Sequence, residues 1–136
     1  MNTAQPDTVF VAEVAGQVAG GVITNAIGSQ VQDIEEGCDP VIVPLIELEN
    51  CALNTHYINA LAVFHEFQRQ WIGAALLHEI ERRHPDINLS LIVEDTNVSA
   101  RRLYEREGYL ARDTAPICRG GWETDAQTYI LMIWEH

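Results

Sequence analysis

The strongest constraint on the fold is a strand-like segment that leads through a short polar stretch into a helix. Residues 57–63, Tyr-Ile-Asn-Ala-Leu-Ala-Val, are apolar and predict a strand. Residues 71–84 predict an amphipathic helix, because Ile72, Leu76 and Ile80 recur every four residues. A strand that turns directly into a helix points several unpaired backbone N–H groups at one place, and such a place binds phosphate.

Other apolar patterns predict further strands and helices around this unit. Residues 9–14 and 18–23 flank a Gly-containing turn and predict a β-hairpin. Thr96 or Asn97 can cap a later helix, and Gly108 can end it. The remaining elements expected are a loop over 28–40, helices over 44–53 and 98–107, and strands over 89–93, from 109 to 111 and over 128–134. This order is typical of an α/β protein.

The composition bounds the class of protein. With 136 residues, 47% of them hydrophobic, the chain can fill one core, which predicts a single domain over residues 1–136. No apolar run is long enough for a membrane span, and no N-terminal leader pattern is present, so a soluble, cytoplasmic protein is expected. The three widely spaced cysteines are expected to be reduced thiols. The histidines lack metal-ligand spacing, so no metal is expected.

The net charge of −12 argues against nucleic acid as a partner, because phosphate contacts need a basic surface. The same charge is compatible with a basic substrate such as an amine, attracted by the field of the protein. Acidic surfaces also simply keep proteins soluble, and charge by itself does not select a substrate.

Two segments carry motifs of a known family. The run Leu61-Ala62-Val63 is followed by Gln68-x-x-Trp71-x-Gly73, and Asn97 begins the pattern N-x-x-A-x-x-L-Y-x-x-x-G-Y without a gap. These segments resemble the strand, the acyl-CoA pyrophosphate loop (Q/R-x-x-G-x-G/A) and the later helix of the GNAT superfamily of acyl-CoA-dependent N-acyltransferases. Trp71 stands where the first loop glycine belongs, and a histidine replaces a usual proline after the strand.

The resemblance implies a three-layer α+β fold, with a mixed, mostly antiparallel twisted sheet flanked by helices. It implies acetyl-CoA as co-substrate, and a strand 57–63 that splays from its neighbour so that its backbone pairs with pantetheine. The residues it assigns to the acyl-CoA are Leu61, Ala62, Val63, Gln68, Arg69, Gln70, Trp71, Ile72, Gly73, Ala74 and Asn97.

Tyr104 is the candidate catalytic residue. It recurs with Asn97 and with Ala100 or Arg101 on one helix face. The resemblance implies that it protonates the departing CoA thiolate, and a phenol with an unperturbed pKa of about 10 carries the proton needed. The alternative is an ordinary half-buried aromatic side chain.

The general base is poorly marked. Strand alternation is expected to place Tyr57 and Asn59 on one face with Leu61 and Val63. Tyr57 and Asn59 are therefore candidates on the substrate side, where either could hold a water molecule that relays a proton. A polar strand end without function is the alternative.

The backbone angles of Trp71 determine whether the loop can adopt the conformation of the family pattern. Tryptophan can donate its backbone N–H from helical angles, which are open to every L-residue. If the position demands a positive φ, tryptophan costs on the order of 1–2 kcal/mol and distorts the loop.

The leading hypothesis is an N-acetyltransferase in which a primary amine, on a small molecule or a peptide, attacks acetyl-CoA directly in a ternary complex. Relatives usually begin with a strand and helices before the hairpin, which this sequence lacks. A second subunit is therefore expected to cover the edge of residues 9–14, giving a homodimer. The competing hypotheses are a degenerate domain that binds CoA or a protein partner without catalysis, and a purely structural domain.

Overall fold

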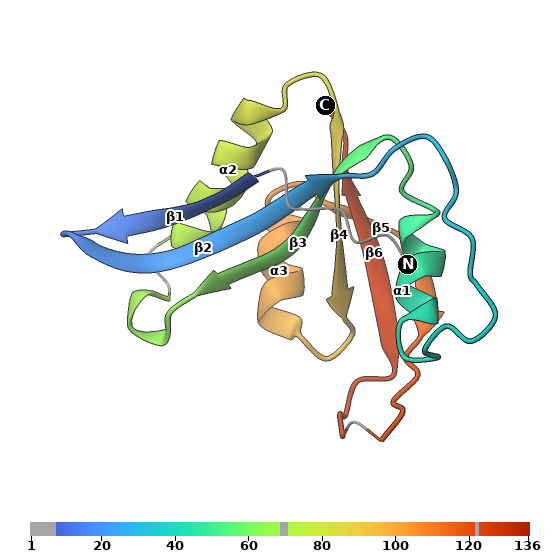
Figure 1. Cartoon of the computed structure of the whole chain (residues 1–136). Coiled ribbons are helices and arrows are strands. Elements are labelled where there is room, and N and C mark those ends of the chain that lie inside the picture. Colours follow the sequence, from blue (N-terminus) through green and yellow to red (C-terminus); the bar gives the residue numbers. More distant parts are fainter. Residues whose placement is uncertain (1–7, 69–70, 122) are drawn as a thin grey trace.

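The computed structural model describes residues 8–68, 71–121 and 123–136. Within these ranges six strands form one sheet in the order β1-β2-β3-β4-β6-β5 (Figure 1). In chain order the elements are β1 (Thr8–Val14), β2 (Gln17–Ala26), α1 (Val43–Glu49), β3 (Thr55–Val63), the 3₁₀ helix η1 (His65–Phe67), α2 (Ile72–Arg83), β4 (Asn88–Glu94), α3 (Val98–Arg106), β5 (Leu110–Pro116) and β6 (Thr128–Trp134).

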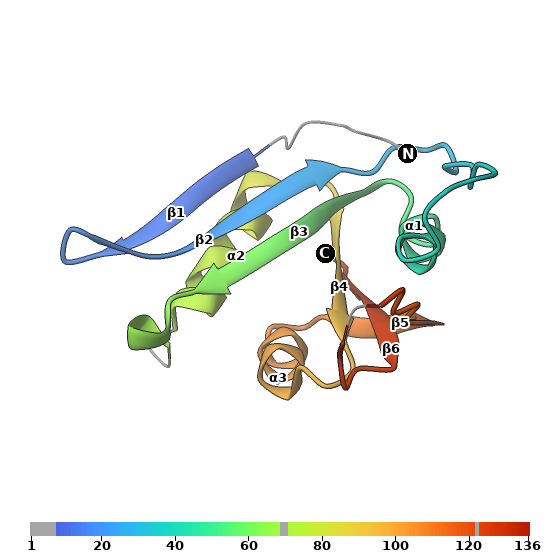
Figure 2. The ribbon, with the colours of Figure 1, turned by 60° about the horizontal axis from the view of Figure 1, so that its bottom comes forward.

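The sheet is mixed and mostly antiparallel, as the resemblance implies. Strand β3 pairs with β4 in parallel, and the other neighbouring pairs are antiparallel. Helices α2 and α3 cover one face, where Leu77 and Tyr104 share a core with Ile58 and Leu91. Helix α1 covers the other face, where its Leu48 packs with side chains of β5 and β6. The helices and the sheet therefore form three layers, with a core on each side of the sheet (Figure 2).

Local sequence signals place most elements correctly. Helix α2 ends one residue before the predicted limit, and its buried stripe includes Leu76 and Ile80. Of the two possible caps for α3, Asn97 is the one used, because its side-chain oxygen accepts from the backbone N–H of Ala100 at 3.3 Å. Gly108 follows that helix with a φ of 97°, the left-handed conformation that ends helices. Helix α1 is shorter than predicted and ends at Glu49.

Two further properties concern the cysteines and the apolar helices. All three cysteines are free thiols. Among the described residues, no helix is long and apolar enough to cross a membrane.

The prediction that Tyr57, Asn59, Leu61 and Val63 share one face of β3 is wrong. Ala60 pairs with Ile23, but Ile58 pairs with the next residue of β2, so Asn59 is an extra residue on β3. This β-bulge shifts the alternation of the strand by one residue. Leu61 and Val63 consequently pack against the same core as Ile58, whereas Tyr57 and Asn59 lie on the opposite face.

Strands β3 and β4 separate along their length. Their parallel pairing starts at Thr55 and Asn88 and ends at Ile58 and Leu91. Beyond these pairs the two strands diverge, as Figures 1 and 2 show. The second half of β3 therefore keeps β2 as its neighbour on one edge and, within the described part of the chain, has no paired strand on the other.

Candidate active site

The open edge of β3 is the first part of the site. From Ala60 to Val63 the strand pairs with β2 but no longer with β4. Alternate backbone N–H and C=O groups on that edge have no strand partner and can bond an extended ligand as an added strand would. The splay implied by the family resemblance is thus present, and it exposes the backbone of Leu61, Ala62 and Val63.

The N-terminus of α2 is the second part. Its first intrahelical bond runs from the N–H of Ala75 to the carbonyl of Trp71, so the earlier N–H groups of Ile72, Gly73 and Ala74 have no acceptor within the helix. No side chain caps this end. Such uncapped donors, together with the positive end of the helix dipole, favour an anionic group.

The loop between the strand and the helix is described in part. The side-chain amide of Gln68 donates to the carbonyl of Val63 at 3.3 Å, which ties the loop to the end of β3. Arg69 and Gln70, both assigned to the acyl-CoA from the sequence, lie outside the described residues.

Trp71 adopts the conformation that glycine would prefer. Its φ is 63° and its ψ 15°, in the left-handed region, and it stands immediately before the first helical residue. The Cβ of an L-residue makes this conformation unfavourable by about 1–2 kcal/mol. Glycine adopts the same conformation without this cost. The indole is 68% exposed, so it does not fill the interior of the site.

Arg106 is a positive group beside this loop that the sequence motifs did not single out. Its guanidinium lies 5.1 Å from the centroid of the Trp71 ring, a cation–π contact between α3 and the start of α2. Its ion pair with Glu107 is long, at 3.8 Å. A cation next to the uncapped helix N-terminus adds to its attraction for phosphate.

Gly73 sets the spacing between the two helices. A Cβ at this position would lie 2.8 Å from the Leu103 Cδ2 atom, so the start of α2 approaches α3 closely. The same helix α3 carries Tyr104. The contact therefore fixes the position of the helix N-terminus relative to the candidate acid.

Tyr104 is a buried tyrosine in the core between α3 and the sheet. It is 8% exposed, and its ring lies 5.9 Å from that of Tyr109. Burial raises the pKa of the Tyr104 hydroxyl, because the phenolate would be poorly solvated. Among the described residues its hydroxyl has no hydrogen-bond partner. The group is protonated at neutral pH and can donate to a ligand atom. Asn97 lies at the start of the same helix, where its amide oxygen is used by the cap.

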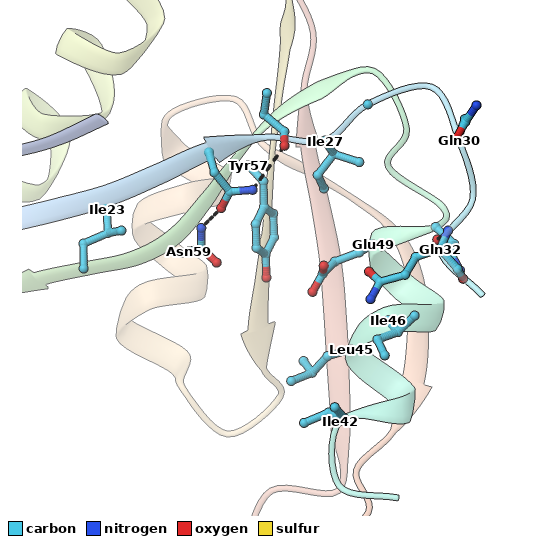
Figure 3. A pocket seen from close by; sticks show the side chains of 14 residues that line it. Ile23, Ile27, Gln30, Gln32, Ile42, Leu45, Ile46, Glu49, Tyr57 and Asn59 are labelled. Atoms are coloured by element: carbon cyan, nitrogen blue, oxygen red, sulfur yellow. Dashed lines mark hydrogen bonds between the residues drawn. The ribbon is translucent and has the colours of Figure 1, made fainter. Parts of the chain in front are cut away.

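A cavity of about 500 Å³ lies on the opposite face of the sheet (Figure 3). We refer to it as the α1 pocket, because α1 and the segment before it form its outer wall. Tyr57 and Asn59 both line it, which places the two substrate-side candidates in one cavity. The Asn59 side chain donates to that of Asn25, which in turn donates to the carbonyl of Ala26 at 3.2 Å.

The α1 pocket also contains a residue that the sequence patterns did not indicate. Glu49, the last residue of α1, lines it, and burial raises the pKa of its carboxyl. In Figure 3 the Glu49 carboxylate and the Tyr57 hydroxyl are directed toward one another. Burial, and then the nearby Glu49 carboxylate, raise the pKa of Tyr57 well above its ordinary range. In the sequence, the only sign of this position is an acidic residue within a short predicted helix.

Two residues of β3 and β4 near this pocket do not line it. His56 is buried on the other face, within 2.7 Å of the Thr24 hydroxyl. Ile92 packs against the core beneath α1. Among the described residues, no group of three or more His, Cys, Asp or Glu side chains could hold a metal ion.

The chain is similar to known acetyltransferases in sequence pattern and in fold. Residues 2–109 match the model of the Acetyltransferase (GNAT) family. A search among curated proteins finds no match. Among solved structures, a GNAT family acetyltransferase from Elizabethkingia anophelis with acetyl-CoA bound superposes with a TM-score of 0.68 at 16% identity, over 94% of this chain and 75% of that one.

Two other solved structures share the fold. A putative streptothricin acetyltransferase from Bacillus anthracis, in complex with acetyl coenzyme A, gives a TM-score of 0.69 at 14% identity, over 98% of this chain and 65% of that one. The ribosomal-protein-S18-alanine N-acetyltransferase from Escherichia coli gives 0.64 at 21% identity, over 93% and 67%. This chain thus spans about two thirds of the length of either protein, and identities this low speak to the fold alone.

Proposed function

The chain belongs to the Acetyltransferase (GNAT) family of enzymes, and from that premise we propose that it transfers an acetyl group from acetyl-CoA to a primary amine. The transfer takes place in a ternary complex, by direct attack of the amine on the thioester. The observation that carries the proposal is the end of β3–β4 pairing at Ile58 and Leu91, beside an uncapped helix N-terminus.

Acetyl-CoA is proposed to bind along the open edge of β3 and the start of α2. The amide groups of pantetheine bond the backbone of Leu61, Ala62 and Val63, as an added strand would. The pyrophosphate accepts from the N–H groups of Trp71, Ile72, Gly73 and Ala74, with Gln68 beside it. Arg106 supplies a nearby positive charge, and Asn97 faces the pantetheine from α3.

The proposed chemistry uses one side chain and the backbone. The nitrogen lone pair forms a bond to the acetyl carbonyl carbon, and backbone N–H groups of β3 stabilise the negative oxygen that develops. The C–S bond then breaks, and the Tyr104 hydroxyl protonates the departing thiolate. The tyrosinate regains a proton from the amine nitrogen, directly or through water, which leaves an amide and free CoA.

The positive φ of Trp71 favours a second candidate, a degenerate domain that binds CoA or a protein partner without catalysis. A strained loop binds pyrophosphate less tightly if its N–H groups are displaced. The left-handed conformation of Trp71 supports the enzyme, because it is one that the glycine of the family pattern also adopts readily.

Calorimetric titration with acetyl-CoA, followed by an assay of thiol release with a panel of amines, separates these candidates. The enzyme is expected to bind acetyl-CoA and to release thiol in an amine-dependent manner. Binding without release across the panel would favour the degenerate domain. An absence of acetyl-CoA binding would overturn both and leave a structural domain.

We also propose that the protein is a cytoplasmic homodimer with no nucleic-acid or membrane partner. Strand β1 is at one end of the sheet, where its outer edge has no paired strand among the described residues. Val9 and Val11 on this strand are 65% and 54% exposed. A second copy that pairs with this edge would cover it.

A further inference from the structure

We propose that the acceptor is a primary amine on a largely apolar body, bound in the α1 pocket with its ammonium group at Glu49. This inference rests on the proposed acetyltransferase function and names the substrate class of its acceptor side. Three observations support the inference: the apolar pocket, the Glu49 carboxylate in it, and the location of the pocket at the bulge of β3.

The α1 pocket lies across β3 from the proposed acyl-CoA site. Tyr57 and Asn59, at the bulge of β3, line the pocket. The part of β3 after the bulge no longer pairs with β4, so the edge that faces β4 is open. Helices α2 and α3 pack on the face opposite to the pocket. An amine that enters through the α1 pocket would therefore meet a thioester on β3 from the opposite side, without competing for the cofactor path.

The walls of the pocket suit an apolar body. Its described lining includes the aliphatic side chains of Ile23, Ala26, Ile27, Ile42, Leu45 and Ile46. A volume of about 500 Å³ is sufficient for a small organic molecule. Burial of such a molecule against aliphatic side chains is favourable roughly in proportion to the apolar area removed from water.

The charge in the pocket suits one cation. Of the described residues, Glu49 is the one acidic residue that lines it, and no Lys, Arg or His does. Glu49 forms no ion pair with any described residue. A partly buried carboxylate without a cationic partner is unfavourable, and an ammonium ion would compensate it. The net charge of −12 would attract such a cation from solution.

The pocket is held in shape before any ligand binds. The backbone N–H of Gln32 donates to the Asn50 side chain at 2.8 Å, and the amide of Asn50 donates to the Gln32 carbonyl at 2.9 Å. The N–H of Ile27 donates to the Thr55 carbonyl at 2.9 Å. These bonds fasten the segment after β2 to the end of α1 and the start of β3. A preformed site loses less entropy on binding.

Glu49 also supplies a place for the proton that an ammonium ion must lose. The carboxylate takes one proton from the ammonium group, and the neutral amine then attacks the acetyl carbonyl as described above. The protonated carboxyl releases this proton to water after the product has left. The net reaction yields an amide, a thiol and one proton from the ammonium ion and acetyl-CoA.

The test measures amine binding and turnover in variants of one helix. Cyclohexylmethylamine is the probe for an apolar monocation, ethanolamine is its polar counterpart, and spermidine is a polycation. Glu49→Gln keeps the size of the side chain and removes its charge. Glu47→Gln on the exposed side of α1 is the matched control, since it makes the same chemical change outside the pocket.

The wild-type protein is expected to bind cyclohexylmethylamine more tightly than ethanolamine or spermidine in a calorimetric titration without acetyl-CoA. Glu49→Gln should weaken this binding by roughly tenfold or more, and should raise the KM for the amine with unchanged affinity for acetyl-CoA. Glu47→Gln should leave all of these values unchanged.

The outcomes separate this inference from the proposed function. If the wild type binds and turns over acetyl-CoA but Glu49→Gln binds and acetylates the amine equally well, the inference is wrong and the acetyltransferase stands. A wild type that binds none of the amines, or prefers spermidine, also overturns the inference. Loss of acetyl-CoA binding in the wild type itself would instead overturn the proposed function.

Discussion

Single residues decide whether the proposed site can function, and the backbone angle of Trp71 is the first to test. Its φ of 63° places a bulky side chain where the family pattern has glycine. This conformation strains the backbone, and the centroid of the indole ring lies 5.1 Å from the guanidinium of Arg106. Tyr104 and Glu49 differ from Trp71, because their side chains and not their backbone angles are unusual. Burial raises the pKa of each side chain.

Trp71→Gly is expected to raise the free energy of unfolding. Glycine removes about 1–2 kcal/mol of left-handed strain that the folded wild type carries, partly offset by its greater flexibility when unfolded. Urea denaturation measures the change. Trp71→Ala is the control, because it removes the indole but keeps the Cβ that causes the strain. Equal stabilities of the two variants would contradict a cost at this backbone angle, and weaker acetyl-CoA binding by both in calorimetry would make the indole a contact.

Tyr104→Phe is expected to lower kcat by about 10²-fold with little change in acetyl-CoA affinity, because only the transition state needs its proton. Tyr109→Phe is the matched control in the same core. Tyr109 is fully buried, and its hydroxyl has no partner within the described part of the chain. Its removal should leave kcat unchanged and raise the free energy of unfolding by about 1 kcal/mol. Unchanged turnover in Tyr104→Phe would exclude Tyr104 from the mechanism.

Glu49→Gln is expected to make the protein more stable at neutral pH. The folded state raises the pKa of Glu49, so it favours the neutral carboxyl. The stability that this residue contributes is complete below its unfolded pKa and is lost as the pH rises through its folded pKa. The stability gain of the variant should therefore be largest at pH 7 and vanish in acid. Urea unfolding at several pH values measures it, and a gain independent of pH would contradict the argument.

At the scale of elements, the shape of β3 organises the site. Its bulge turns Tyr57 and Asn59 toward α1, and its separation from β4 frees the backbone that follows. Strand β2 supports this stretch from the other edge. Gly20 is essential there, since a Cβ on it would lie 2.5 Å from the carbonyl oxygen of Ala62.

Gly20→Ala is expected to displace the open part of β3 from β2. The contact is with backbone and cannot be relieved by a side-chain rotation, so a loss of about 1–3 kcal/mol in the free energy of unfolding follows. Weaker acetyl-CoA binding should accompany it. Gly21→Ala is the neighbouring control, because its nearest contact would be an ordinary 3.4 Å. Chemical denaturation and calorimetry should show an effect in the first variant and little in the second.

At the scale of the whole molecule, the sheet is divided between two tasks. On one side of the divergence, β4, β5 and β6 pair with one another and lie between α3 and α1. The hairpin of β1 and β2 extends away from it together with β3, as Figure 1 shows. The proposed site lies where the two parts separate, and the proposal gives the acyl donor and the acceptor opposite sides of the same strand.

Sedimentation velocity should detect a dimer whose population increases with protein concentration. The expected cause is the unpaired outer edge of β1 with its exposed Val9 and Val11. Val11→Lys places a charge on this strand and should shift the equilibrium toward monomer. A monomeric profile of the wild type at high concentration would contradict the prediction.

Local patterns were sufficient for most elements and for the family. The four-residue repeat of Ile72, Leu76 and Ile80 gave α2, and the motif from Asn97 to Tyr109 gave α3 and its cap. The face of β3 was predicted wrongly, because the bulge depends on how β2 pairs with it and leaves no mark in the spacing of β3 itself. Glu49 was missed because its burial depends on the packing of α1 over the sheet.

By itself the sequence determined what each segment can form and which groups the protein has available: its helices, its strands, the acyl-CoA motifs and Tyr104. These follow from the spacing of neighbouring residues. The tertiary structure decided where β3 leaves β4, which way Tyr57 and Asn59 point, that Trp71 has a positive φ, and that Glu49 shares their pocket. These properties depend on strand register and on packing between segments far apart in the chain, which local periodicity does not specify.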